Sequence, residues 1–148
     1  RKEVRIDPHP LTGFYLSAVN AGPLVLTAGE VAIDTSVPRF LNRFDQIDDE
    51  GRSLPYGRIH EEKPIMVESW HVYSRLKEYV EASGASMDDV VHQAVYMVNP
   101  DEYPALERIA TLFYGSRLPP TTVVPVLGAT PYRQATLEIE VVAVTDGG

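Results

Sequence analysis

The sequence predicts a single α+β domain over residues 1–148, in which short strands alternate with two amphipathic helices. Three observations support this fold class. The 148 residues are 44% hydrophobic and 23% charged, which fits one globular domain with a real core. Two segments repeat apolar residues with the helical period, and the segments around them alternate as strands do. No internal repeat or linker divides the chain. The predicted order is two or three strands, a helix, a strand, a helix and two strands.

The N-terminal part is expected to form a hairpin. The first seven residues are charged and indicate either a frayed end or an edge strand. Two short β-type runs follow, Phe14–Asn20 and Leu24–Ala28, with an Ala-Gly-Pro turn between them. Residues 31–33 are expected to continue the second strand after Gly29.

From about residue 35 to 62 the sequence shows neither the hydrophobic period of a helix nor that of a strand. This enlarged loop carries scattered aromatic residues and four arginines: Arg39, Arg43, Arg52 and Arg58. A loop of this length in a small domain is usually functional or disordered. Two interpretations stay open, a solvated insertion and a lid or pocket wall.

Two helices follow, each with recognisable ends. Pro64 suits the first turn of the first helix, and Gly84 suits its C-terminal end. Asp101 is the expected N-cap of the second helix, and Gly115 lies near its end. Residues at helical spacing give each helix one apolar stripe: Val67, Trp70, Tyr73 (or Ser74), Leu76 (or Lys77) and Val80 in the first, and Leu106, Ile109, Ala110 and Phe113 in the second.

The remaining strands are predicted at Val90–Val98, Thr121–Leu127 and Gln134–Val144. In the last strand, Glu138 and Glu140 share one face, opposite an apolar face. A carboxylate that faces a cleft can orient a water or shuttle a proton, and burial raises its pKa toward a useful range. The alternative is a carboxylate that faces solvent or pairs with an arginine.

Composition excludes several classes of function. The formal net charge of -8 counts against a broad nucleic-acid-binding face. No apolar run has the length of a membrane span, and no signal peptide is visible. The absence of cysteine removes disulfides and thiolate chemistry, which fits a cytoplasmic protein. The four histidines lack metal-ligand spacing, and no phosphate-binding glycine loop or serine-nucleophile motif occurs.

Five segments together resemble the Rid family, also called YjgF or L-PSP-like proteins. They are residues 26–32 (LTAGEVA), 75–91 (RLKEYVEASGASMDDVV), 95–99 (VYMVN), 118–126 (LPPTTVVPV) and 137–144 (LEIEVVAV). The resemblance covers nearly the whole chain apart from the enlarged loop, which is longer than the usual connection by about twenty residues.

The resemblance implies a chorismate-mutase-like fold, with a mixed sheet and two helices packed on one face. It also implies a homotrimer with a central barrel and small-molecule clefts between subunits. The implied activity is hydrolysis of reactive enamines and imines, such as 2-aminoacrylate, to a keto acid and ammonia, without a metal or an organic cofactor. The protein then has only to hold the substrate, position a water and manage protons.

The resemblance assigns roles to several residues. Glu138 matches the glutamate that orients water, Tyr15 matches a tyrosine at the cleft edge, and Gly29 matches a glycine whose backbone approaches the ligand. The arginine that clamps the substrate carboxylate in the family falls on Thr121, and a frequent cysteine falls on Val123. Threonine offers a hydroxyl but no charge, so ligand binding loses about 1.5–3 kcal/mol.

A different cation is one remedy for this loss. Arg39 or Arg43 in the enlarged loop, or Arg133 before the last strand, is a candidate to bind a different anionic substrate. The favoured function is a Rid-like deaminase whose substrate differs from 2-aminoacrylate. The alternative is a non-catalytic trimeric protein that binds a small metabolite. A lyase or hydrolase acting on chorismate ranks last, and the acidic charge argues against a ribonuclease.

Overall fold

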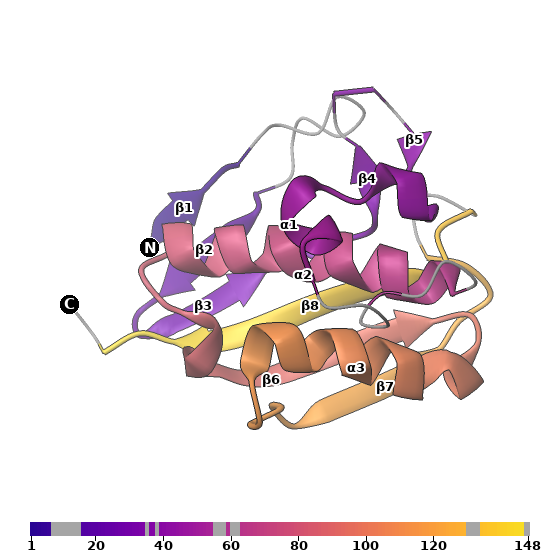
Figure 1. Ribbon diagram of the computed structural model, residues 1–148. Helices are drawn as coiled ribbons and strands as arrows, with labels where there is room; N and C mark the ends of the chain where they lie inside the picture. The colour runs from indigo at the N-terminus through magenta and orange to yellow at the C-terminus, as the bar shows by residue number, and fades with distance from the viewer. Residues whose placement is uncertain are drawn as a thin grey trace.

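The fold is a six-stranded mixed sheet with two helices on one face, seen in a computed structural model (Figure 1). The structure describes residues 1–6, 16–34, 36–37, 39–54, 59, 63–129 and 134–146. The strands lie in the order β1-β2-β3-β8-β6-β7. The predicted α+β class with a mixed sheet and two helices on one face is confirmed.

The N-terminal strands form the predicted hairpin with one more strand at the edge. β2 (Ala18–Ala21) and β3 (Leu24–Thr27) are antiparallel, and Gly22 turns between them with a φ of 62°. A positive φ suits glycine, which has no Cβ to clash. β1 (Lys2–Val4) pairs with β2, so the charged N-terminus is an edge strand. The predicted start of the first hairpin strand, residues 14–15, lies outside the described residues.

The C-terminal strands supply the centre of the sheet. β8 (Leu137–Val144) lies antiparallel between β3 and β6 (Val90–Met97). β7 (Thr121–Pro125) is parallel to β6 and forms the other edge. Alternate residues of β8 are buried, beginning with Leu137, because one face of this strand lies under the helices. Glu138 therefore belongs to the opposite face of the sheet, which we call the open face.

Both predicted helices are present. α2 (Pro64–Ala82) begins at Pro64, and the chain turns away at Gly84, whose φ is 88°. α3 (Tyr103–Tyr114) ends at Gly115 with a φ of 61°. The prediction that Asp101 caps this helix is wrong. Asn99 accepts a hydrogen bond from the Asp101 backbone N–H (3.2 Å) and caps a 3-10 turn over 100–102, which precedes α3.

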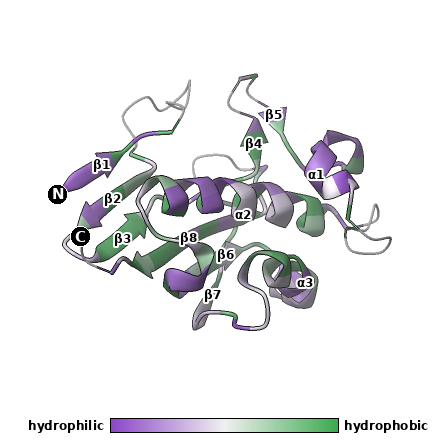
Figure 2. Cartoon of the chain, turned by 60° about the vertical axis from the view of Figure 1, so that its left-hand side comes forward, coloured by the Kyte–Doolittle hydropathy of each residue, from purple (hydrophilic) through white to green (hydrophobic). Residues whose placement is uncertain are grey.

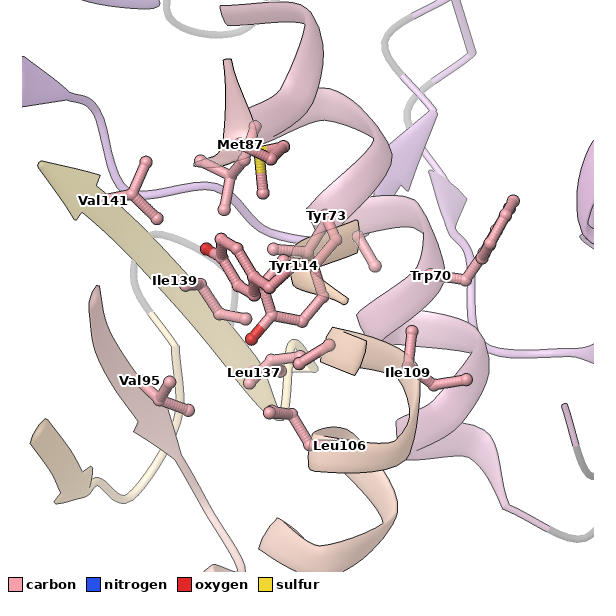
Figure 3. Close-up of a cluster of buried hydrophobic side chains, with 14 of the residues drawn as sticks. Trp70, Tyr73, Met87, Val95, Leu106, Ile109, Tyr114, Leu137, Ile139 and Val141 are labelled. Atoms are coloured by element: carbon pink, nitrogen blue, oxygen red, sulfur yellow. The ribbon is translucent and has the colours of Figure 1, made fainter. Parts of the chain in front are cut away.

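The core lies between the sheet and the two helices (Figure 3). One polar side chain, Gln93 of β6, is fully buried there. Its Oε1 accepts hydrogen bonds from the hydroxyls of Tyr73 in α2 (2.9 Å) and Tyr114 in α3 (3.3 Å). Its Nε2 donates to Thr121 Oγ1 at 2.8 Å. Gln93 thus ties both helices and the edge strand β7 to the sheet, and both polar atoms of its side chain are hydrogen-bonded.

The enlarged loop is more regular than its sequence indicates. It contains a hairpin of β4 (Ile33–Asp34) and β5 (Arg39–Phe40), a 3-10 turn at Phe44–Gln46, and a short helix, α1 (Asp49–Arg52). The expectation that residues 31–33 extend β3 is wrong, because Ile33 begins β4 in a separate two-stranded sheet. These elements are too short to show a hydrophobic period.

α1 rests on the outside of α2. Asp48 Oδ1 accepts hydrogen bonds from the Gly51 backbone N–H (2.7 Å) and from Trp70 Nε1 (3.1 Å). Ile47 is 1% exposed, and Gly51 has no room for a Cβ against Trp70. α1 therefore packs on the helical side of the molecule, away from the open face (Figures 1 and 2).

Among the described residues, no helix combines the length and the apolar character that crossing a bilayer requires.

Candidate functional site

Glu138 is the strongest candidate for a catalytic group in the described residues. It is the second residue of β8, lies opposite Tyr96 of β6, and is half-buried on the open face. Burial raises the pKa of its carboxyl group, and the nearby negative charge of Glu140 raises it further. A carboxyl group whose pKa is moved toward neutrality can both accept and return a proton.

Gly29 lies directly against the Glu138 side chain. A Cβ built at Gly29 would lie 2.9 Å from Glu138 Cδ and 3.1 Å from Cγ, and it would collide with Oε1. Only glycine allows this approach, although Gly29 has no positive φ. The Gly29 backbone thus lies against the Glu138 carboxyl group, and its approach to a ligand stays a prediction.

Polar side chains surround Glu138 on the open face. The hydroxyl of Tyr96 donates to Glu140 Oε1 at 3.2 Å, and the charge of Glu140 raises the pKa of Tyr96. Farther along β6, His92 Nε2 lies 3.2 Å from Thr122 Oγ1 of β7. This face therefore carries carboxylates, a phenol and an imidazole but, among the described side chains of β6, β7 and β8, no lysine or arginine.

Thr121 does not join Glu138 within one chain. It lies opposite the buried Gln93 on β6, so its side chain belongs to the face under the helices. Its hydroxyl accepts from Gln93 and donates to the carbonyl of Pro119 at 2.9 Å. β6 also separates β7 from β8. A site that used both residues would need a second chain.

Arg39 and Arg43, the two candidate arginines of the enlarged loop, each form an ion pair with an aspartate of the same loop. Arg39 contacts Asp34 Oδ2 through Nε (3.2 Å) and Nη2 (3.1 Å). Arg43 binds Asp45 through two parallel contacts of 3.0 and 3.1 Å. Both pairs are local and on exposed side chains, so neither arginine is directed to Glu138. Tyr15 and Arg133 lie outside the described residues.

No spacing in the sequence indicates a second, partly buried carboxyl group beside this site. The residue after Gly29 is Glu30, whose Oε2 accepts a hydrogen bond from the Tyr79 hydroxyl at 2.6 Å. Burial raises the pKa of Glu30 to about 7. Tyr79 is 49 positions away on α2, so no local spacing could indicate this pair.

The described residues contain no group of three His, Cys, Asp or Glu side chains arranged to hold a metal ion. The described residues bring carboxyl groups and the Tyr96 phenol to this site. A half-buried carboxylate such as Glu138 can hold and polarise a water.

The chain is similar to several known proteins. Residues 7–145 match the family model described as Endoribonuclease L-PSP. A protein named 2-iminobutanoate/2-iminopropanoate deaminase, from Dermatophagoides farinae, is 27% identical over 141 residues, covering 95% of this chain and 92% of that protein.

Solved structures agree with the fold. A candidate endoribonuclease from Klebsiella pneumoniae is 25% identical, with a TM-score of 0.77, over 88% of this chain and 99% of that one. RidA from an Antarctic Psychrobacter species is 20% identical, with a TM-score of 0.73, over 97% and 99% of the two chains. Because residues 7–145 of the 148 match the family model, the chain belongs to the Endoribonuclease L-PSP family, which is also called the Rid or YjgF family.

Proposed function

We propose that this protein is a Rid-like deaminase that hydrolyses a small enamine or imine different from 2-aminoacrylate. The main support for this function is Glu138, a half-buried carboxyl group with a raised pKa that lies against the Gly29 backbone. The deaminase name of the Dermatophagoides farinae relative supports the reaction class.

The reaction asks little of the protein. The imine carbon is already electrophilic, so the Glu138 carboxylate has only to accept a hydrogen bond from water and direct its oxygen at that carbon. As the carbon–oxygen bond forms, Glu138 takes a proton from the water and passes it to nitrogen. A second proton then moves from the new hydroxyl group to nitrogen through Glu138, the carbon–nitrogen bond breaks, ammonia leaves, and a carbonyl product remains. The raised pKa of Glu138 suits both proton transfers.

The substrate is proposed to differ from 2-aminoacrylate because the family's clamping cation is absent from its usual position. Thr121 offers one hydroxyl, and that hydroxyl is already hydrogen-bonded to Gln93 and Pro119. A charge-assisted contact to a substrate carboxylate is worth about 1.5–3 kcal/mol. A substrate that does not depend on that contact fits this site better than a minimal imino acid.

We also propose a chorismate-mutase-like homotrimer with the clefts between subunits. Leu24 and Leu26 of β3 are 41% and 38% exposed on the open face, beside Val142 and Val144 of β8. Apolar side chains gathered on one sheet face are stabilised when a second sheet covers them. A second chain would also be needed to bring β7 to the Glu138 face.

Ammonia release tests the proposed function. An amino-acid oxidase generates imines in the assay from a series of amino acids with small, branched, aromatic and acidic side chains. We expect the protein to accelerate ammonia release for at least one imine and to do so least for the smallest. No acceleration with any imine would contradict the proposal.

The alternative is a trimeric protein that binds a small metabolite without turnover. The observation that favours it is the lack of a cation beside Glu138 among the described strand residues. Calorimetric titration with 2-keto acids separates the two functions. Saturable binding without ammonia release from any imine would favour the binding protein.

A further inference from the structure

Glu30 is fixed from two sides. Its backbone exchanges two hydrogen bonds with Ile139, the residue after Glu138, at 2.8 and 3.0 Å. Its side chain points toward α2 and accepts a hydrogen bond from the hydroxyl of Tyr79 at 2.6 Å. Gly29, which touches the Glu138 carboxyl group, is the preceding residue. The two residues 29–30 therefore bridge β8 and α2 at the proposed site.

Tyr79 is itself held in place. It is 5% exposed, and the Arg75 guanidinium lies over its ring at 5.3 Å from the centroid. Arg75 Nη2 also lies 3.4 Å from the Tyr79 hydroxyl, while Nη1 pairs with Glu78 at 2.8 Å. One turn of α2 thus presents a rigid donor to Glu30, as a hydrogen bond to a buried acceptor requires.

We propose that Glu30 is a positioning residue for Glu138, which fixes the Gly29 backbone against the Glu138 carboxyl group through its contact with Tyr79. This inference rests on the proposed hydrolysis at Glu138. It assigns Glu30 no direct contact with substrate.

The electrostatics make this positioning sensitive to pH. Burial raises the pKa of Glu30 to about 7, while the Tyr79 hydrogen bond and the charge of Arg75 lower it, and Glu78 and Glu138 raise it. These are the charged and titratable groups that face Glu30 from α2 and β8. Ionisation above pH 7 strengthens the hydrogen bond from Tyr79, because a carboxylate accepts more strongly than a carboxylic acid. It also places a second negative charge beside Glu138.

The pH dependence of kcat/KM for ammonia release tests the inference. In the wild type, we expect kcat/KM to fall about tenfold from pH 6 to pH 8, as the neutral fraction of a group with a pKa near 7 does. Glu30→Gln, which stays neutral, is expected to remove this fall. Tyr79→Phe removes a hydrogen bond that lowers the pKa of Glu30, so it is expected to move the midpoint to higher pH. Glu81→Gln, an exposed carboxylate on α2, is the matched control and should leave the profile unchanged.

A second readout separates this inference from the proposed function. The backbone amide resonance of Gly29, followed by NMR from pH 5.5 to 8.5, is expected to shift with a midpoint near 7 in the wild type and not in Glu30→Gln. A wild type that releases no ammonia defeats the proposed function, whatever the resonance does. A Gly29 resonance without that midpoint, or one that keeps it in Glu30→Gln, overturns the role of Glu30.

Discussion

At the scale of single residues, the site depends on how closely a backbone approaches a carboxyl group. Gly29 leaves no space between itself and Glu138, and Glu30 anchors the same segment from the helical side. The carboxyl pKa values of Glu30 and Glu138 are both raised, chiefly by burial. These two contacts are where small substitutions have large and separable effects.

Gly29→Ala should distort the site. The added Cβ would lie 2.9 Å from Glu138 Cδ, so the Glu138 side chain or the strand has to move. We expect a loss of about 1–3 kcal/mol in the free energy of unfolding, measured with urea. In a Glu138→Ala background the collision is gone, so the same substitution should cost much less. Equal costs in the two backgrounds would mean that this contact is not the cause.

Glu30→Gln should stabilise the fold at high pH. The pKa of Glu30 is about 7 in the folded protein and 4.5 as its ordinary value, so its protonation favours folding below pH 4.5. That contribution is lost as the pH rises from 4.5 through 7. We expect Glu30→Gln to exceed the wild type by about 1–3 kcal/mol at pH 8 and to differ little at pH 4.5. The free energies of unfolding are measured with urea at both pH values. If the two proteins differ by the same amount at pH 4.5 and pH 8, Glu30 does not titrate with a raised pKa in the folded protein.

At the scale of elements, the sequence predicted those helices and strands that are long enough to show a hydrophobic period. The two helices had long periods and ended at Gly84 and Gly115, whose positive φ angles stop a helix. The alternation of β8 correctly placed Glu138 opposite the buried face. The insertion was missed because α1 has only four residues and its hairpin strands have two each.

The site could be predicted only in part, because its contacts join residues that are far apart in the chain. The separate roles of Gly29 and Glu138 came from resemblance, and their direct contact was not predicted, since the two residues are far apart in the chain. The Glu30–Tyr79 pair joins a strand end to a helix, and the engagement of Thr121 by Gln93 joins two strands. Such contacts depend on tertiary packing, which no local pattern in the sequence encodes.

The insertion should depend on Asp48. This residue caps α1 and accepts from Trp70, the one tryptophan of the chain. Asp48→Ala is expected to cost about 1–2 kcal/mol and to change the fluorescence of Trp70. Asp48→Asn keeps an acceptor oxygen and should recover most of the loss, while Asp49→Ala serves as the exposed control. Unaltered fluorescence in Asp48→Ala would mean that α1 does not rest on α2 in solution.

At the scale of the whole molecule, the two sides of the sheet differ in character. The three helices cover one side, whereas the open face keeps Leu24 and Leu26 exposed and carries two acidic residues of β8 farther along that strand. One chain supplies Glu138 on this face but keeps Thr121 on the other. Assembly is therefore expected to complete the site as well as to cover apolar surface.

Sedimentation tests the assembly. We expect a mass of three chains for the wild type and a smaller mass for Leu26→Lys, because a charge in an apolar interface is costly to desolvate. Val37→Lys changes an apolar residue of the insertion that is at least as exposed as Leu26, and it should keep the mass of the wild type. A monomeric wild type at micromolar concentration, or a trimeric Leu26→Lys, would contradict a trimer built through the open face.

The most direct test compares two carboxylates of one strand. Glu138→Gln and Glu140→Gln remove the same charge from the same face, two residues apart, and only Glu138 lies against Gly29. With the best imine, kcat/KM for ammonia release should fall by about 100-fold or more in Glu138→Gln, as expected when a proton-transfer group is lost. Glu140→Gln should change it by less than about tenfold. Full activity in Glu138→Gln, or an equal loss in both variants, would contradict a hydrolytic site built on Glu138.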